Sequence, residues 1–361
     1  MSEPRRITFP HMGSYWVPLK RIAELSGAEV VVPPRITRHT IDIGARYSPE
    51  FVCVPFKYTL GSFIESLEAG ANVVCQLCGG CRFSYYAEVQ EAILHDLGYE
   101  FEFLSFQGGA NILEVMLDYQ RKAAPHTSVA RIAKAFFDAF RMAEAIDEVQ
   151  GRIRRDLAFE VEPGSLRRVE STFLHELDAT RTPRQVKDLR VETMRKLDEV
   201  PVDRPERPLR VAVVGELYVV MEPYSNSRIE DELARNGVEV HRSLDLTTLI
   251  RHAIGHRSHI REMLEGADPY VTRHIGAEGT ESVARTLAAI REGYDGVVHL
   301  KPFGCMPEVN AMAAMQRISR EHTFPILFVS CDAQSAEAGL RTRVEAFADM
   351  LRIREAGVID A

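Results

Sequence analysis

Cysteine is the residue type through which this chain is best equipped to do chemistry. Six are present: Cys53, Cys75, Cys78, Cys81, Cys305 and Cys331. The two-residue gaps within 75–81 match three ligands of a ferredoxin-type iron–sulfur cluster, although the further Cys-Pro of that motif is missing. Zinc accepts four thiolates equally well, and Cys78-Gly79-Gly80-Cys81 has the spacing of a dithiol redox pair. A buried cysteine is also common as a plain apolar residue, an interpretation strongest for Cys75 and Cys331 inside apolar runs.

The cysteines recur at one kind of position, the expected carboxyl end of a strand. Cys53 lies in the apolar run 51–54, Cys75 and Cys78 at the end of 71–77, Cys305 after 296–300, and Cys331 after 325–330. Open α/β sheets bind ligands at this edge. Several of these cysteines also precede helical segments, whose N-termini lower a thiol pKa and favour the thiolate that binds metal. Agreement among four separate segments predicts a metal or redox site built from distant parts of the sequence.

Apolar runs alternate with segments of helical spacing in the first and last thirds of the chain. The expected strands are 6–9, 28–32, 51–54, 71–77 and 99–104 in the first unit, and 209–214, 238–241, 296–300 and 325–330 in the second. The helices expected among them include 17–25, 58–68, 82–97 and 227–235. Strand, helix, strand in this rhythm predicts an α/β fold with parallel sheets covered on both faces.

The middle third has the pattern of amphipathic helices. Its apolar residues recur at spacings of three and four; they are Ile132, Phe136, Phe140, Ile146, Val149 and Ile153. The stripe predicts a helical layer packed on a sheet or on a partner subunit, so a homodimer and intramolecular packing both account for it. The charged, Pro-rich stretch 200–208 is the expected interdomain linker. The expected division is a first α/β domain, a helical segment, and a second α/β domain with a helical insertion, spanning 1–110, 111–200 and 201–361.

Composition and charge narrow the class of protein. The 361 residues carry 44 Lys and Arg against 52 Asp and Glu, a net charge of −8 that argues against a nucleic-acid partner. With 45% hydrophobic and 27% charged residues, the chain is expected to be globular. No apolar run approaches the ~20 residues that span a bilayer, and residues 1–6 do not resemble a signal peptide. We therefore expect a cytoplasmic protein without a membrane partner, in which closely spaced cysteines indicate metal or redox chemistry more than disulfides.

Several stretches, in chain order, resemble a known family. They are Phe9-Pro10-His11-Met12-Gly13, 51–57, Gly79-Gly80-Cys81-Arg82, Gly215-Glu216-Leu217-Tyr218, Glu222-Pro223-Tyr224-Ser225-Asn226, 301–308 and 342–347. Through them the chain is similar to the iron–sulfur proteins of the 2-hydroxyacyl-CoA dehydratase and benzoyl-CoA reductase superfamily. The closer similarity is to the branch often labelled acyl-CoA dehydratase activase-related, or CoA-enzyme activase.

The resemblance implies two Rossmann-like domains with an iron–sulfur cluster in the cleft between them. The family's ligands match Cys53, Cys81 and Cys305, three thiolates for a [4Fe-4S] cluster whose fourth iron is open to water or substrate. The other three cysteines have no clear counterpart in the family. As an alternative, all six thiolates hold a double-cubane [8Fe-9S] cluster, as in other proteins of this superfamily. The residues expected near the cluster or substrate, from their places in strand-to-helix loops, are Lys57, Arg82, Glu216, Glu222, Asn226 and Glu308.

Low-potential electrons are implied to come from a separate ATP-hydrolysing activator protein, as in anaerobic metabolism. The chain has no GxxxxGK[ST] loop, so we do not expect it to bind ATP itself. The resemblance thus implies a redox protein acting on a CoA-linked or other small substrate, as a 2-hydroxyacyl-CoA dehydratase-like lyase or a reductase. Two alternatives are left open: a non-catalytic electron carrier or accessory subunit with the same cluster, and a structural zinc protein.

Overall fold

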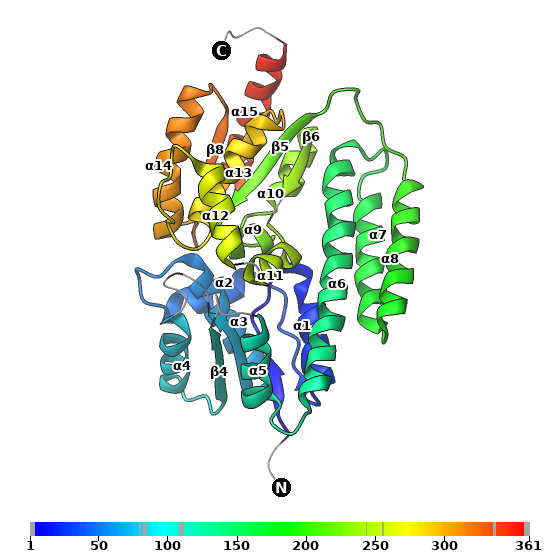
Figure 1. Cartoon of the computed structure of the whole chain (residues 1–361), viewed down its shortest axis with the longest axis vertical. Coiled ribbons are helices and arrows are strands. Elements are labelled where there is room, and N and C mark those ends of the chain that lie inside the picture. Colours follow the sequence, from blue (N-terminus) through cyan, green and yellow to red (C-terminus); the bar gives the residue numbers. More distant parts are fainter. Residues whose placement is uncertain are drawn as a thin grey trace.

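Two sheets of four parallel strands each form the framework of the molecule (Figure 1). The computed structural model describes residues 4–78, 81, 85–107, 112–242, 244–254, 256–334 and 337–356. Helices link the strands, so the predicted α/β fold with two parallel-sheet domains and a helical middle segment is confirmed. Within these ranges no helix is long and apolar enough to cross a membrane.

The first sheet has the strand order β2-β1-β3-β4. Its strands are β1 (Arg6–Thr8), β2 (Glu29–Val30), β3 (Val73–Cys78) and β4 (Glu102–Gln107). Its helices are α1 (Trp16–Leu25), α2 (Arg38–Tyr47), α3 (Val54–Glu68) and α4 (Tyr86–Asp96). Because successive side chains of a strand point to opposite faces, Val73 packs in the apolar cluster on one face of β3, and Val74 packs in the cluster with α3 and α4 on the other.

The second sheet repeats that order as β6-β5-β7-β8. Its strands are β5 (Leu209–Gly215), β6 (Val238–Arg242), β7 (Gly296–Pro302) and β8 (Ile326–Cys331). Its helices are α9 (Leu217–Met221), α10 (Ile229–Arg235), α11 (Leu246–Ile254), α12 (His256–Ala267), α13 (Gly279–Arg291), α14 (Met306–Glu321) and α15 (Glu337–Glu355). In both sheets the strand order reverses beside the first strand, at the kind of switch point where such sheets bind ligands.

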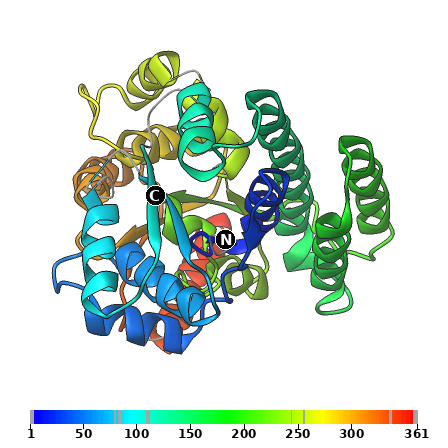
Figure 2. The same ribbon diagram turned by 90° about the horizontal axis from the view of Figure 1, so that it is seen from below.

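The middle of the chain is helical and stands beside the two sheets (Figure 2). Its helices are α5 (Ile112–Ala123), α6 (Val129–Asp156), α7 (Ser165–Ala179) and α8 (Pro183–Asp198), and single 3₁₀ turns occur at η1 (Gly13–Tyr15) and η3 (Leu157–Phe159). Four residues of the predicted apolar stripe, Ile132, Ile146, Val149 and Ile153, are fully buried in α6, which packs against α1, α8 and β6. The stripe therefore packs within the chain, and a homodimer stays a prediction.

The segment around Cys53 differs from the prediction. Residues 51–54 do not form a strand: Phe51 is 91% exposed, and Cys53 is the N-cap of α3. An unpredicted helix, α2, precedes this segment and starts from a capping box at Thr37. A four-residue apolar run fits a strand or the start of a helix equally well, and here Pro55 in the first turn favours the helix. The prediction that Cys53 ends a strand was wrong for this reason.

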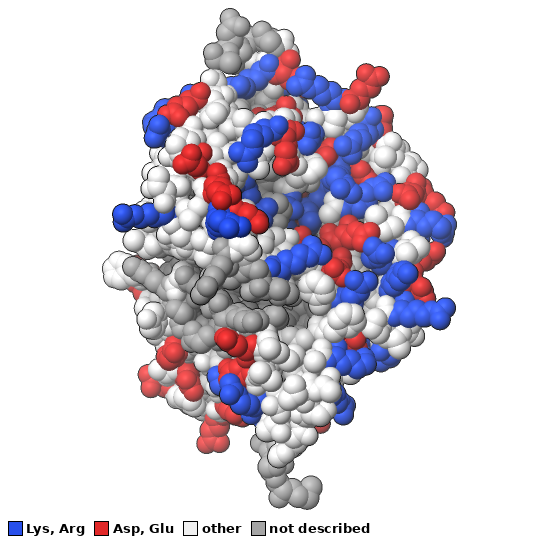
Figure 3. Space-filling model, viewed as in Figure 1, with Lys and Arg blue, Asp and Glu red and all other residues white. Residues whose placement is uncertain are grey.

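One apolar core joins both domains to the helical layer. It includes Tyr15 from the first domain, Val211 from β5 and several residues of α6. The expected linker 200–208 is also attached to the helical layer, where Val202 pairs with Glu160 in an isolated antiparallel bridge. Buried contacts therefore hold the two sheets in position. On the outer surface of the helical layer, positive and negative side chains are intermixed (Figure 3).

Close contact between α2 and α3 depends on two glycines. A Cβ at Gly61 would lie 2.0 Å from the carbonyl oxygen of Thr40, and one at Gly44 would lie 1.8 Å from that of Lys57. We expect Gly61→Ala to lower the free energy of unfolding by about 2 kcal/mol, because the two helices must separate. In α6 a Cβ at Gly151 meets nothing closer than a flexible arginine group at 3.7 Å. Gly151→Ala should therefore raise the free energy of unfolding by about 0.5–1 kcal/mol. Urea unfolding measures both changes, and shifts of the same sign would contradict this account.

Candidate metal centre

Cys53 and Cys305 occupy the same local structure in the two domains. Cys53 is the N-cap of α3 and Cys305 is the N-cap of α14, each with an extended backbone and with a proline two residues later, Pro55 and Pro307. Proline suits the first helical turn, because an N–H there has no partner within the helix. The partial positive charge of each helix N-terminus is directed at the cysteine. A Cys-x-Pro sequence at two helix starts is thus the local signal that places these two sulfurs.

Cys53 interacts electrostatically with both of the other predicted ligands, Cys81 and Cys305. The pKa of the Cys53 thiol is raised to about 12, mainly by burial and further by Glu216 and Cys81. Burial and then Glu216 also raise the pKa of Cys305, and Cys53 contributes to that rise. Charge effects of this kind require short distances in surroundings with little water. Cys53, Cys81 and Cys305 therefore share one neighbourhood, although they come from three loops and two domains.

Two further cysteines, Cys331 and Cys75, differ from each other in their surroundings. Cys331 ends β8, and its pKa is raised to about 12, mainly by burial and then by Glu216, so it borders the same neighbourhood. Cys75 lies in the middle of β3 and not at its end as predicted, because the strand continues to Cys78. Its thiol is buried in an apolar cluster, and the charged groups that act on it are Arg5 and Glu102. The surroundings of Cys75 are thus those of a core residue.

The donor set is compatible with an iron–sulfur cluster. Among the residues that the structure describes, no group of three or more His, Cys, Asp or Glu side chains is arranged to hold a single metal ion. The thiolates around a [4Fe-4S] cluster bind different irons, so they stand farther apart than the ligands of one ion. Burial keeps Cys53 and Cys305 protonated near neutral pH when no metal is bound. Loading a cluster therefore has to release these protons.

Two of the predicted carboxylates lie beside the thiols, where both raise the pKa of Cys305. Glu216 is the N-cap of α9, and its oxygens accept hydrogen bonds from the N–H groups of Tyr218 and Val219, each at 3.1 Å. Glu308, in the first turn of α14, places Oε2 2.6 Å from Nε2 of His299, and this pair is almost completely buried. These carboxylates therefore line the site but also stabilise helix starts and a strand.

Three residues beside the site are missing from the sequence prediction. His299 was signalled only as a polar residue within the apolar run 296–300. Glu278 precedes α13, and burial followed by the neighbouring carboxylates raises its pKa well above the ordinary value. Tyr86 begins α4, and its hydroxyl oxygen lies 3.2 Å from the Sγ of Cys53. Only the tertiary structure brings Tyr86 to a cysteine and the other two side chains to the carboxylates of the site.

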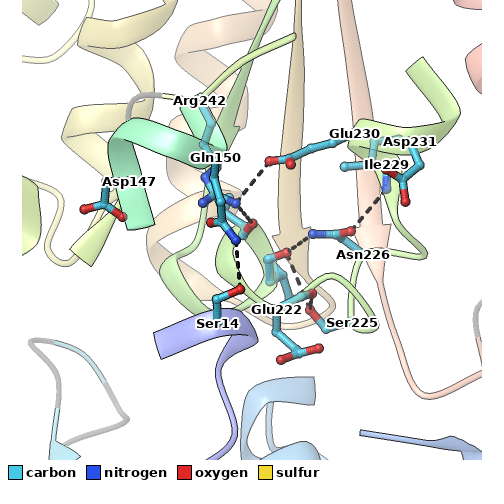
Figure 4. Close-up of polar contacts among 12 residues, drawn as sticks. Ser14, Asp147, Gln150, Glu222, Ser225, Asn226, Ile229, Glu230, Asp231 and Arg242 are labelled. Atoms are coloured by element: carbon cyan, nitrogen blue, oxygen red, sulfur yellow. Dashed lines mark hydrogen bonds and ion pairs between the residues drawn. The ribbon is translucent and has the colours of Figure 1, made fainter. Parts of the chain in front are cut away.

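Glu222 and Asn226 hold loops in place, and Figure 4 shows the bonds of Asn226. Glu222 is 3% exposed; its Oε2 accepts a hydrogen bond from the N–H of Gly13 at 2.7 Å and lies 2.8 Å from Nδ1 of His11. Asn226 donates from Nδ2 to a carbonyl of α9 at 2.6 Å, and its Oδ1 accepts from the first N–H of α10 at 3.2 Å. These bonds join the two domains and fix the loop between α9 and α10.

The remaining predicted residues are placed only in part. Lys57 lies in the first turn of α3, four residues after Cys53, and is half-buried. Arg82 lies outside the described residues, as does the side chain of Cys78, although the backbone of Cys78 ends β3. The roles predicted for these three residues therefore stay predictions.

A polar network ties the helical layer to both domains (Figure 4). Gln150 of α6 donates from Nε2 to the Oγ of Ser14 at 2.8 Å, which reaches the first domain. In the second domain, buried Arg242 pairs with Glu230 at 3.0 Å. Burial alone would raise the pKa of Glu230, but arginines of β6, α6 and α7 together hold it below its ordinary value. The helical layer thus helps to set the position of one sheet relative to the other.

A cavity of about 370 Å³ lies away from the cysteines, between α6, α8 and α11. Four Lys or Arg side chains and four Asp or Glu side chains line it, so its charges balance. No cysteine and no other predicted site residue is among its described lining residues. The cavity is therefore separate from the candidate metal centre.

Comparison with known proteins adds no family assignment. No family model matches the chain, and no curated protein matches it. The case for a metal centre therefore rests on the geometry of the cysteines and on the motifs that carry the resemblance.

The stability of the metal-free chain should fall as the pH rises from about 4.5 to 7, because of Glu216. Its pKa is raised from 4.5 to about 7, mainly by burial; the N–H groups of Val219 and Tyr218 oppose the rise, and Glu308 adds to it. The folded chain then holds this proton more tightly than the unfolded chain. Glu216 therefore contributes up to about 3 kcal/mol that is present at low pH and lost as the pH passes its folded pKa.

Urea unfolding of the metal-free protein at several pH values measures this effect. The Glu216→Gln variant has no titrating group at this position. Across the same pH range, its free energy of unfolding should therefore fall by up to about 3 kcal/mol less than that of the wild type. Parallel pH profiles for the two proteins would show that Glu216 titrates normally.

Proposed function

We propose that this chain is an iron–sulfur redox protein that acts on a CoA-linked or other small substrate, with low-potential electrons from a separate ATP-dependent activator. Cys53, Cys81 and Cys305 are its ligands to a [4Fe-4S] cluster, which leaves one iron without a thiolate. The observation that carries the proposal is the convergence of three thiols from two domains, two of them at helix N-termini with the same Cys-x-Pro sequence. When bound, the cluster supplies one-electron transfer.

The chain's own residues hold the ligands and shield them from water. The N-termini of α3 and α14 favour thiolate over thiol, and the backbone N–H groups of Phe56 and Glu308 act in the same direction on Cys53 and Cys305. Cys305 is only 8% exposed, so solvent reaches it little. The carboxylate of Glu308, whose Oε2 lies 2.6 Å from Nε2 of His299, also acts on this cysteine through its charge. If a cluster is bound, this pair would be able to hold or pass a proton beside it.

A single cubane is favoured over the double-cubane [8Fe-9S] cluster. The larger cluster needs further thiolates beside the first three. Cys75 is turned into the apolar cluster of β3, with Arg5 and Glu102 as its charged neighbours. Cys331 borders the site near Glu216 and remains the candidate for an additional ligand.

An exposed apolar rim next to the cysteines supports docking of the electron donor. Phe51 and Phe303 each lie two residues before a predicted ligand and are 91% and 67% exposed, and Tyr85, four residues after Cys81, is 74% exposed. Large exposed aromatic side chains are typical of protein interfaces. We place the contact with the activator at this rim. A cytoplasmic location belongs to the same proposal, since closely spaced thiols stay reduced there.

Metal analysis of anaerobically purified protein tests the proposal. We expect a brown protein with a broad charge-transfer absorption and about four irons and four sulfides per chain. A colourless protein that contains zinc and no sulfide would overturn it in favour of a structural zinc site. Rapid mixing of the loaded protein with acyl-CoAs then separates two cases: the cluster spectrum of an enzyme changes on substrate binding, whereas that of a non-catalytic electron carrier does not.

A further inference from the structure

Tyr86 places a hydroxyl group against Cys53. It is the first residue of α4, is 7% exposed, and packs edge-on against Phe56 of α3, with ring centroids 4.7 Å apart and an interplanar angle of 88°. Its Oη lies 3.2 Å from the Sγ of Cys53 and 3.3 Å from the backbone nitrogen of the same residue. Packing therefore fixes the ring, while the hydroxyl meets Cys53 at two atoms.

The two contacts determine the direction of the hydrogen bond to sulfur. The backbone N–H of Cys53 is only a donor, so the Tyr86 oxygen accepts from it. A metal-bound thiolate carries no hydrogen, so in its bond with Sγ the Tyr86 hydroxyl can only donate. A tyrosine hydroxyl, with an ordinary pKa of about 10, carries its hydrogen near neutral pH. The hydroxyl therefore remains protonated and able to donate.

Cys305 lacks an equivalent partner, although its position at the start of α14 matches that of Cys53 at the start of α3. Within the described part of the chain, no side chain donates a hydrogen bond to its sulfur, and the donor that lowers its pKa is the backbone N–H of Glu308. The two helix starts are thus alike in backbone and different in side-chain hydrogen bonding. Of the two cysteines at these helix starts, Cys53 is therefore the one on whose sulfur a described side chain acts directly.

We propose that Tyr86 is a positioning residue that raises the reduction potential of the centre by donating a hydrogen bond to the Cys53 thiolate, an inference that rests on the proposed function. Reduction adds negative charge to the cluster and its sulfurs, and a hydrogen bond strengthens as the charge on its acceptor grows. The hydroxyl therefore stabilises the reduced state more than the oxidised state. Hydrogen bonds to sulfur are among the known determinants of cluster potentials. Tyr86 itself gains or loses neither an electron nor a proton in this role.

Tyr86→Phe keeps the packing against Phe56 and removes only the hydroxyl. In an anaerobic redox titration followed by visible absorption and EPR, we expect a midpoint potential more negative than that of the wild type. A tenfold change in the equilibrium constant for reduction corresponds to about 59 mV for a one-electron couple. Tyr218→Phe is the matched control, because Tyr218 is 5% exposed and its hydroxyl has no hydrogen-bond partner among the described residues. Its potential should equal that of the wild type.

A ring-fluorinated tyrosine at position 86 gives a test of opposite sign. Its more acidic hydroxyl is a stronger donor, so the midpoint potential should become more positive. If Tyr86→Phe fails to bind iron, the sign of the potential shift in the fluorinated protein tests the role of Tyr86 by itself. Unchanged potentials in both variants would overturn the role of Tyr86 and leave the iron–sulfur proposal intact. A wild-type protein without iron and sulfide would instead overturn the proposed function and this inference together.

Discussion

Replacement of Cys305 by alanine is expected to remove most of the iron that the chain binds after anaerobic reconstitution. Cys305 is the thiol that the second domain contributes at the start of α14. Loss of an outer-shell partner already costs about ten- to a hundredfold in metal affinity, so loss of a thiolate should cost more than about tenfold. Cys53→Ala and Cys81→Ala should have the same effect, because each leaves two of the three thiolates. Iron and sulfide per chain, together with the visible spectrum, measure it.

Cys75→Ala is the matched control for these variants. Cys75 and Cys305 are both 8% exposed, so the two substitutions remove similar buried groups. Cys75 lies inside β3 with its thiol in an apolar cluster, and we expect its variant to keep the iron of the wild type. Equal losses in the two variants, or full iron content in Cys305→Ala, would contradict the assignment of ligands.

Cys331→Ala distinguishes the two kinds of cluster. With a single [4Fe-4S] cluster held by the three predicted ligands, iron content should not change. With a double-cubane cluster that uses Cys331, roughly half of the iron should be lost, because one of two cubanes loses a ligand. Cys331 is 3% exposed and ends β8, so a thermal unfolding curve is needed to show that the variant is folded.

The sequence predicted the fold well where pattern and structure are both local. Buried parallel strands are largely apolar runs, and 209–214 and 325–330 stand out as such, whereas 238–241 alternates valine with Glu239 and His241. The structure places β5, β6 and β8 there. The failure at 51–54 has a physical cause, since four apolar residues do not distinguish a strand from a helix start. Helix α2 was missed because its capping box, at Thr37, pairs two threonines and not the usual Ser or Thr with Glu.

The candidate site was predicted where a motif marks each residue, and not where only tertiary contacts do. Cys53 and Cys305 each precede a helix, so their places follow from a local signal. Tyr86 meets Cys53 across 33 residues of sequence, and no spacing rule connects them. Glu222 was placed near the cluster by its loop, but its carboxylate is used to bind the loop that contains Gly13. Such roles depend on which groups remain unsatisfied after folding, which a pattern does not show.

Replacement of Asp147 by alanine is expected to lower the free energy of unfolding by about 4 kcal/mol. Asp147 of α6 joins all three parts of the chain. Its Oδ1 accepts from the hydroxyl of Tyr15 at 2.5 Å, and its Oδ2 accepts from the N–H and the hydroxyl of Thr247 at 3.0 and 2.6 Å. Alanine leaves the hydroxyl of Tyr15 and the N–H of Thr247 without this acceptor, each at a cost of about 1–3 kcal/mol, whereas the hydroxyl of Thr247 keeps its bond to Asp245. Burial raises the pKa of Asp147, so burying its charged carboxylate has a cost. Alanine removes that cost, which offsets part of the sum.

The matched control is Glu144→Ala, one turn earlier on the same helix. Glu144 lines the same cavity as Asp147, but its ion pairs with Arg141 and Arg251 are partly exposed. Pairs of that kind contribute less than about 1 kcal/mol. Urea unfolding compares the two variants, and a loss below about 1 kcal/mol in Asp147→Ala would show that water replaces the carboxylate. Because Cys53 and Cys305 belong to different domains, a loosened contact at Asp147 should also weaken iron retention, whereas Glu144→Ala should leave it unchanged.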